Sequence, residues 1–200
     1  LEDLRAQIGF VSQDVFLFSE NVFENVGFGL AGAENPARRA AIVAEASLIA
    51  AVDEEIAGLP KGYETLLGER GVNLSGGQKQ RVSLARAIAT EPSILILDDA
   101  LSAVDVKTEE AILRNLRSRS RQNTELISAH RISTVKRADR IFVLDQGELV
   151  EEGRHAELIR RPSGIYAQFY EEQRLKEDLE SYMRQIDEKL GLEPIEGGAT

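Results

Sequence analysis

The sequence predicts an α/β fold with a mostly parallel sheet, because short apolar runs alternate with longer segments of helical character. Ile94–Leu97 is a continuous run of four apolar residues, which is typical of a strand covered on both faces. Gln7–Val11 and Glu125–Ser128 predict two further short strands. The chain has 200 residues, 42% of them hydrophobic, which favours one domain with an appendage.

Helices are expected between these strands. Asn21–Gly29 predicts a short helix and a loop, and alanine-rich Pro36–Ala51 predicts a longer helix. Gly58–Gly71 holds Pro60 and four glycines, which indicates a loop. The next helix should begin near Ser75 and run to about Thr90, since Pro92 follows.

The second half of the chain continues the alternation. Helices are predicted over Val106–Ser118, Arg131–Arg137 and His155–Arg161. Ile141–Asp145 and Glu148–Glu152 flank Gln146-Gly147, which predicts a β-hairpin. From Glu171 to the end, nine acidic and four basic residues contribute −5 of the formal net charge of −10. An amphipathic helix is expected here, packed on its own domain or, alternatively, on the C-terminus of a partner subunit.

Composition excludes several classes of function. The 34 acidic against 24 basic residues argue against a general binder of nucleic acid or anionic membranes, because phosphate binding needs a basic face. The absence of cysteine excludes disulfides, thiolate metal sites and cysteine nucleophiles, and two histidines argue against a histidine-rich metal site. The chain contains no run of about 18 apolar residues, which is the length that a membrane-spanning helix needs.

The strongest motif is Leu74-Ser75-Gly76-Gly77-Gln78. Ser75 is a good N-cap, and Gln78 completes a capping box three residues later. The glycines let a ligand approach the backbone, and the positive end of the following helix suits a phosphate. The simpler interpretation is a capped helix after a glycine turn.

A second motif lies twenty residues beyond Gln78. Asp98 follows the apolar run Ile94–Leu97, and ligands of open α/β sheets bind at that end of a strand. A carboxylate in this place can hold Mg²⁺ directly or through water. The simpler interpretation is a solvated pair of aspartates, Asp98 and Asp99, that opens a loop.

Together these motifs resemble the nucleotide-binding domain of an ATP-binding cassette (ABC) transporter, over about residues 1–170. Leu74–Gln78 matches the family's signature motif, and Ser93–Asp98 matches its Walker B strand. Gln13 resembles the glutamine of the family's Q-loop, Ser102–Asp105 resembles its D-loop, and His130 resembles its switch histidine. These motifs stand in the family's order along the chain. The spacings also fit, with 61 residues from Gln13 to Leu74 and 32 from Asp98 to His130.

The resemblance implies ATP and Mg²⁺ as ligands, at sites formed between two domains. Asp98 and Gln13 would hold Mg²⁺, and Gln13, Asp99 and His130 would act on the attacking water and the phosphate. The signature residues Leu74, Ser75, Gly76, Gly77 and Gln78, with Asp105, would contact nucleotide across the dimer. Arg81 and Arg86 are expected to serve packing and solubility.

The resemblance to exporters in particular comes from Gly68–Gly71, a short loop that in such proteins touches the coupling helices of the transmembrane domain. It implies a place at the cytoplasmic face of the membrane, through a transmembrane domain outside this chain. Two alternatives are a non-transport ABC ATPase and a non-catalytic remnant that lends its signature to a partner. The 61-residue spacing leaves no room for the long coiled coil of the chromosome-maintenance type.

Asp99 departs from the family pattern, which has glutamate there as the general base. The aspartate carboxylate reaches roughly 1–1.5 Å less far, and a misplacement of about 1 Å can cost on the order of 10²-fold in rate. We therefore expect that the ATP site with Asp99 is degenerate and hydrolyses ATP slowly. A chain of this kind would form one half of an asymmetric heterodimer.

The P-loop motif is the second departure, because no Gly-Lys pair occurs in the chain. We expect a C-terminal fragment of a half-transporter that binds ATP very weakly alone, with an apolar sheet face left uncovered. The expected organisation is a partial nucleotide-binding domain over residues 1–170, with a helical subdomain at about 14–73, and a helix and tail over 171–200.

Overall fold

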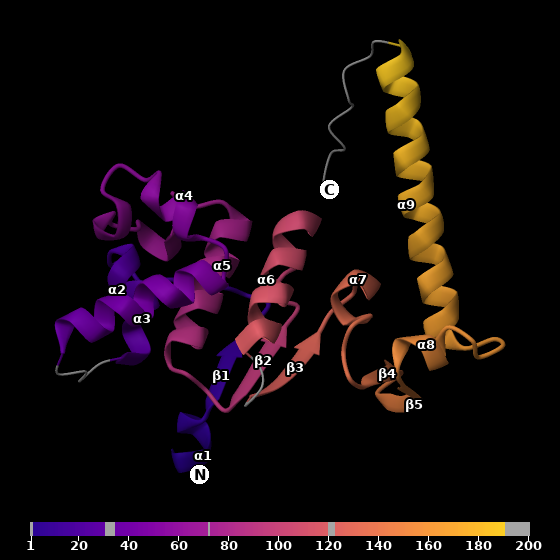
Figure 1. Ribbon diagram of the computed structural model, residues 1–200, viewed down its shortest axis with the longest axis horizontal. Helices are drawn as coiled ribbons and strands as arrows, with labels where there is room; N and C mark the ends of the chain where they lie inside the picture. The colour runs from indigo at the N-terminus through magenta and orange to yellow at the C-terminus, as the bar shows by residue number, and fades with distance from the viewer. Residues whose placement is uncertain (1, 31–34, 72, 120–122, 191–200) are drawn as a thin grey trace. The chain divides into compact units, whose positions relative to one another are not determined.

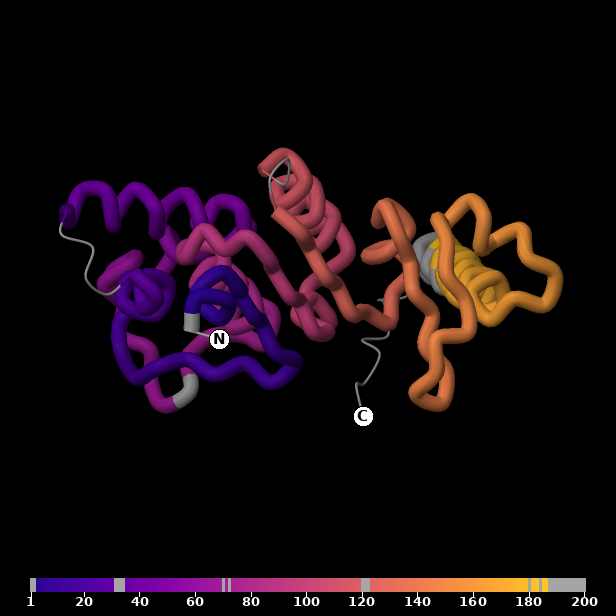
Figure 2. Tube along the Cα trace, turned by 90° about the horizontal axis from the view of Figure 1, so that it is seen from below, coloured from indigo at the N-terminus to yellow at the C-terminus, as the bar shows by residue number. Residues whose placement is uncertain are grey.

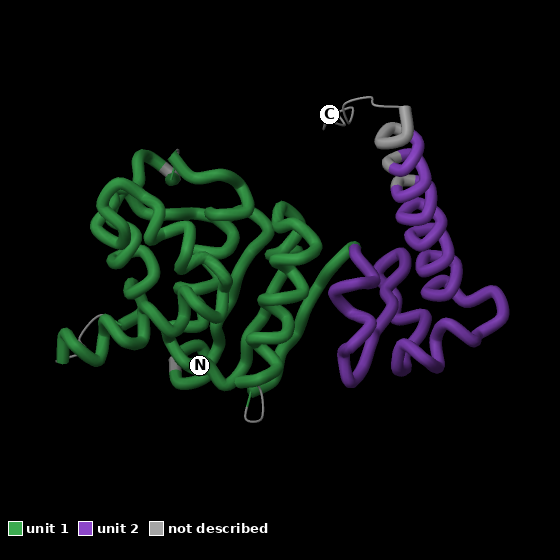
Figure 3. Tube along the Cα trace, turned by 45° about the horizontal axis from the view of Figure 1, so that its top comes forward, with its two compact units in different colours: residues 1–130 green, residues 131–200 purple. Residues whose placement is uncertain are grey.

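The computed structural model describes residues 2–30, 35–71, 73–119 and 123–190. The chain forms two compact units, residues 1–130 and residues 131–200 (Figure 3). The boundary between domains that the sequence suggests near residue 170 remains a prediction.

A three-stranded parallel sheet forms the centre of the first unit (Figure 1). Its strands are β1 (Ile8–Val11), β2 (Ile94–Asp98) and β3 (Thr124–Ser128), in the order β1-β2-β3. All three strands were predicted, and the α/β class with a parallel sheet is confirmed. The register aligns the carboxyl ends of the strands, since Val11 lies beside Leu97 and Asp98 beside Ser128.

Six α-helices accompany this sheet within the described part of the first unit. They are α1 (Glu2–Ala6), α2 (Val22–Val26), α3 (Pro36–Ile49), α4 (Asp53–Ala57), α5 (Gly76–Ala89) and α6 (Val106–Arg119). Short 3₁₀ turns occupy Phe28–Leu30, Gly62–Glu64 and Glu69–Gly71. Helices α2, α3 and α4 gather on the side of α5 away from β3 (Figures 1 and 2).

One face of the sheet carries the core, and the other face is open. Val11 and Leu97 are at most 1% exposed and belong to one apolar cluster with Leu84 of α5 and Ile112 of α6. On the opposite face, Phe10 is 57% exposed. It lies in register with Ile96 and, through it, with half-exposed Leu126. This agrees with the uncovered apolar face that the sequence led us to expect.

The second unit contains α7 (Ile132–Val135), β4 (Ile141–Asp145), β5 (Glu148–Gly153), α8 (His155–Leu158) and α9 (Ile165–Leu190). Strands β4 and β5 form an antiparallel hairpin that belongs to a separate sheet. Gln146 and Gly147 both have positive φ, 49° and 82°, as a two-residue hairpin turn requires. The predicted hairpin is therefore confirmed.

Helix α9 begins six residues earlier than the composition indicates. The Glu151 carboxylate accepts hydrogen bonds from the backbone N–H groups of Ile165 and Tyr166, at 3.1 and 3.0 Å. This cap comes from a residue of β5, so no local pattern reveals it. Further along the helix, Leu175 and Leu179 are about 60% exposed, so this apolar face is left open by the residues of the second unit that the structure describes. None of the described helices has the length and hydropathy needed to cross a membrane.

Candidate functional site

The three parallel strands bring the predicted chemical groups to one edge of the sheet. Gln13 lies two residues beyond the end of β1, Asp98 is the last residue of β2, and His130 lies two residues beyond β3. Because the strands are adjacent and parallel, these positions share the carboxyl edge, where α/β sheets bind ligands. Gln13, Asp98 and His130 are all exposed to solvent.

Asp99 occupies a sharp turn at this edge. Its backbone has φ of 47°, a conformation that aspartate tolerates better than most residues. Its N–H donates to the Ser128 carbonyl at 3.0 Å, which continues the β2–β3 ladder by one residue. Its own carbonyl accepts from the Ser102 hydroxyl at 2.9 Å. Hydrogen bonds of both the N–H and the carbonyl of Asp99 therefore fix the turn, and Asp99 is half-buried.

The donor set at this edge suits Mg²⁺ better than a metal that needs a complete protein cage. Within the described residues, no group of three or more histidine, cysteine or carboxylate side chains could hold a metal ion. Mg²⁺ is usually held by one or two carboxylates together with water and substrate phosphates. Exposed Asp98, with the amide of Gln13 two residues beyond the end of neighbouring β1, fits that pattern.

The N-terminus of α5 has the predicted capping box. The Gln78 N–H donates to Ser75 Oγ at 3.2 Å, and the Ser75 N–H donates to Gln78 Oε1 at 2.9 Å. Ser75 and Gly76 are exposed, whereas Leu74 is only 8% exposed and anchors the turn in the core. The free end of a 14-residue helix thus faces solvent, with polar and glycine residues only.

Gly77 has a structural role that the sequence did not reveal. A Cβ atom at this residue would lie 2.8 Å from the Ala103 carbonyl oxygen, closer than real Cβ contacts. A Cβ atom on Gly76 would lie 3.7 Å from the Ala103 Cβ, which is an ordinary contact. Glycine at position 77 therefore lets α5 approach the loop after β2, besides any access it gives to a ligand.

Asp105 caps α6. Its carboxylate accepts from the backbone N–H groups of Lys107 and Thr108, both at 3.1 Å. The hydrogen bonds to Thr108 lower the pKa of the Asp105 carboxyl. Asp105 is exposed, and its contact with nucleotide remains a prediction.

Arg81 fixes α5 to the neighbouring helical region, as expected of a packing residue. Its Nη2 lies 2.8 Å from both carboxylate oxygens of Glu55, and Nη1 donates to the Ala51 carbonyl at 2.6 Å. Its Nε donates to the Gly77 carbonyl at 3.2 Å, one turn earlier in α5. Arg81 is only 7% exposed, so these bonds hold the first turns of α5 in place.

A buried polar hub, which sequence reasoning missed, joins α5 to the loop that follows Gln13. Arg86 donates to the carbonyl of Asn25 at 2.8 Å and to its side-chain oxygen at 2.7 Å. Arg86 also donates to the Phe16 carbonyl at 2.9 Å and lies over the Phe18 ring. Burial lowers the pKa of Arg86 to about 10. In the predicted short helix VFENV, Asn25 lies three residues after Val22 and directly before Val26, and this polar residue next to apolar positions was the available signal.

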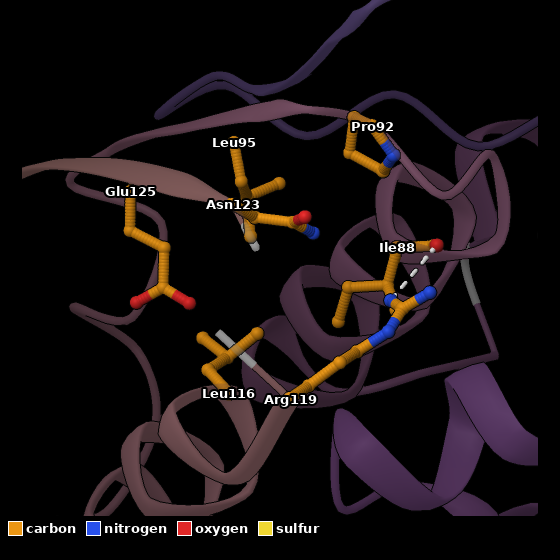
Figure 4. A pocket seen from close by; sticks show the side chains of 7 residues that line it. All are labelled: Ile88, Pro92, Leu95, Leu116, Arg119, Asn123 and Glu125. Atoms are coloured by element: carbon orange, nitrogen blue, oxygen red, sulfur yellow. Dashed lines mark hydrogen bonds between the residues drawn. The ribbon is translucent and has the colours of Figure 1, made fainter. Parts of the chain in front are cut away.

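A small hollow lies at the opposite edge of the sheet. Its volume is about 10 Å³, and Figure 4 shows Leu95, Glu125 and Leu116 among the side chains around it. Burial raises the pKa of the Glu125 carboxyl. Leu95 and Glu125 stand near the amino ends of β2 and β3, so this hollow is distinct from the edge with Asp98. Its volume is that of roughly one water molecule.

Comparison with known proteins gives one matching family model. The model described as "ABC transporter" matches residues 1–102. In the search of solved structures, the structure of a bacterial Atm1-family ABC exporter with ATP bound superposes with a TM-score of 0.79 at 44% sequence identity. That alignment covers 86% of this chain and 29% of the other chain.

Curated relatives agree with this match. An ABC-type transporter, kk1G, of Curvularia clavata is 45% identical over 180 residues, which are 88% of this chain and 14% of the relative. YheI of Bacillus subtilis, named a probable multidrug resistance ABC transporter ATP-binding/permease protein, is 48% identical over 175 residues. That alignment covers 88% of this chain and 29% of YheI. The chain thus spans less than a third of these relatives.

Proposed function

Since the chain belongs to the ABC transporter family and has the ABC ATPase fold, we propose that it is the ATP-binding part of an exporter. ATP binding and hydrolysis at the interface of two such domains would drive the export of a substrate across the membrane. The observation that carries this proposal is the convergence of Gln13, Asp98 and His130 at one edge of a parallel sheet.

The roles of the residues at this edge follow from their chemistry. Asp98 and Gln13 would hold Mg²⁺, which when bound neutralises charge on the phosphates. Asp99, next to Asp98, would accept a proton from the attacking water or orient it. His130, at the end of the adjacent strand, would donate to the terminal phosphate.

The capped end of α5 would serve a nucleotide held by a second subunit. Ser75, Gly76 and Gly77 present a hydroxyl and backbone N–H groups at a helix N-terminus, where anions are favoured. Leu74 and Gln78 would support them through the buried anchor and the capping box, and Asp105 would contact the same interface. In this arrangement each ATP lies between the Walker B edge of one subunit and the signature of the other.

Asp99 makes the two sites of the dimer unequal in our proposal. The aspartate side chain is one methylene shorter than the glutamate expected there, so its own site would be slow. A second half-transporter that carries glutamate at this position would supply the fast site, which the signature of this chain completes. The dimer would therefore be a heterodimer.

The 200 residues contain no P-loop, so the chain by itself should bind ATP very weakly and hydrolyse none. The lysine and the backbone cradle of that loop provide most contacts to the β- and γ-phosphates. Calorimetric titration of the purified chain with Mg·ATP should give no measurable heat of binding at micromolar concentrations. Tight binding would refute this part of the proposal.

The loop before the signature would contact the coupling helices of a transmembrane domain. Glu69 is exposed and lies in the 3₁₀ turn Glu69–Gly71. The side chain of Asn73 holds the residues before this turn, since it accepts from the Gly68 N–H at 2.9 Å and donates to the Leu66 carbonyl at 3.0 Å. A fixed and exposed charged turn suits docking. The domain would thereby stand at the cytoplasmic face of a membrane.

The substitution Asp99→Glu in the full-length protein, assembled with its partner, tests the slow site. We expect ATP hydrolysis at that site to increase by roughly 10-fold or more, because the longer side chain restores the reach of the base. Glutamate adopts a φ of 47° less readily than aspartate, so thermal unfolding must first show that the variant folds normally. An unchanged rate in a folded variant would contradict the proposal.

A further inference from the structure

The loop after β2 is bonded to the signature helix of its own subunit through Gln80. The Gln80 side chain is 6% exposed and lies one turn into α5. Its Oε1 accepts from the Ala103 N–H at 3.0 Å, and its Nε2 donates to Ser102 Oγ at 3.2 Å. Both ends of this buried amide therefore contact one turn of the loop.

The contact extends to the backbone of Asp99 at the Walker B edge. Ser102 Oγ, which accepts from Gln80, donates its own proton to the Asp99 carbonyl at 2.9 Å. Gly77, three residues before Gln80, packs closely against the Ala103 carbonyl on the same side of α5. A continuous chain of bonds thus runs from α5 through Ser102 to the backbone of Asp99.

The two ends of this chain of bonds serve different nucleotides if the proposed function is correct. Asp98 and Asp99 belong to the ATP site of this subunit, whereas Ser75–Gln78 completes the site of its partner. A displacement of the first turn of α5 by the partner's ATP would be passed to the Asp99 turn, because the linking amide is buried and bonded at both ends.

We propose that Gln80 is a positioning residue that couples the two ATP sites of the dimer through a single subunit, an inference that rests on the proposed function. In this proposal Gln80 contacts neither nucleotide. It holds the Asp99–Ala103 turn against the first turn of α5, so that nucleotide at one site changes the geometry of the base at the other.

Hydrogen exchange in the 200-residue chain tests the link without nucleotide. Gln80→Ala should accelerate exchange of the Ala103 amide by about 10-fold, since its acceptor is lost. Gln80→Glu keeps an oxygen acceptor for Ala103 and should change that rate by less than about 3-fold. Ser47→Ala, which removes a buried hydroxyl bonded to Val43 in α3, is the matched control and should leave Ala103 unchanged.

A double-mutant cycle separates coupling from ordinary loss of stability. Ser75→Ala loosens the first turn of α5 and should accelerate Ala103 exchange by about 3-fold. In the Gln80→Ala background, Ser75→Ala should add almost nothing, because the hydrogen-bonded path from α5 to the loop is cut and only the packing of Gly77 on Ala103 remains. Independent effects that multiply, or an Ala103 amide insensitive to Gln80→Ala, would overturn the proposal.

In the full-length dimer, Gln80→Ala should lower kcat for ATP by at least about 5-fold while KM changes by less than about 2-fold. Gln80→Glu should lie between this variant and the wild type, and Ser47→Ala should match the wild type. A changed KM with an unchanged kcat would overturn the coupling role. A wild-type dimer without any ATPase activity would instead contradict the proposed function, while the exchange data would still decide the link.

Discussion

Asn25 is a small side chain whose removal should strongly destabilise the first unit. Its side chain is fully buried and makes hydrogen bonds to two segments. Oδ1 accepts from the Phe18 N–H at 2.8 Å and from Arg86 at 2.7 Å. Nδ2 donates to the carbonyls of Phe18 and Asn21, both at 3.0 Å, and more distantly to that of Glu20.

The cost of Asn25→Ala can be estimated from these bonds. The Nδ2 group has two protons, so its three acceptors count as two hydrogen bonds. With the bond from the Phe18 N–H, three neutral hydrogen bonds at about 0.5–1.5 kcal/mol each are lost, together with one bond to charged Arg86 at about 1.5–3 kcal/mol. Water can reach part of the vacated space, so we expect the free energy of unfolding to fall by about 4 kcal/mol. That is a large share of the ~5–15 kcal/mol by which domains are stable.

Urea unfolding of the chain, followed by circular dichroism, measures this loss. Asn115→Ala is the matched control, because the Asn115 amide is only half-buried and donates at 3.3 Å to the carbonyls of Leu48 and Ile49, the last two residues of α3. We expect the control to cost less than about 1 kcal/mol. A loss below about 1 kcal/mol for Asn25→Ala would refute the view that this hub holds the loop after Gln13.

Three further outcomes are expected. Gly77→Ala should destabilise the chain by about 1–3 kcal/mol, because its Cβ would lie 2.8 Å from the Ala103 oxygen, whereas Gly76→Ala should cost less than about 1 kcal/mol by the same urea assay. Burial, and next the charge of nearby Lys136, lower the pKa of His155 in the folded state. The stability that neutral His155 contributes is therefore present above its unfolded pKa of 6.5 and is lost as the pH falls through the lower pKa of the folded state. The urea midpoint of the second unit should drop between pH 7.5 and pH 5, and His155→Gln should flatten that dependence. Phe10→Lys should reduce aggregation of the chain in light scattering without loss of stability, since Phe10 is 57% exposed on the open sheet face, and an unchanged tendency to aggregate would contradict this.

Local chemistry made several elements predictable. The capping box of α5 needs only Ser75 and Gln78 three residues apart, and the hairpin needs only Gln146 and Gly147 between two strand-forming runs. The apolar run of β2 stands out in the same way. In each case the stabilising contacts join residues that are close in sequence.

Features set by distant contacts were not predictable. The start of α9 depends on Glu151 in β5, and the glycine at position 77 is required by Ala103, which lies on the loop after β2. Helix α4 has only five residues, too few for a hydrophobic period to show.

The candidate site was only partly within reach of the sequence. The motifs pointed to Gln13, Asp98 and His130 separately, and the strand register then placed all three at one edge. The hydrogen bonds that hold the site join Gln80 to Ser102 and Arg86 to Asn25, and the partners of each pair are more than twenty positions apart in the sequence. A single sequence carries no signal for such pairs.

Our central proposal is that this chain completes the fast ATP site of a partner while its own site is slow. The most direct measurement compares two substitutions in the full-length dimer. Asp99→Asn keeps a residue that tolerates the positive φ, and Ser75→Arg blocks the exposed end of α5. We predict that Ser75→Arg abolishes steady-state ATP hydrolysis, whereas Asp99→Asn lowers it by less than about 2-fold. Loss of activity in Asp99→Asn equal to that in Ser75→Arg would contradict the proposal.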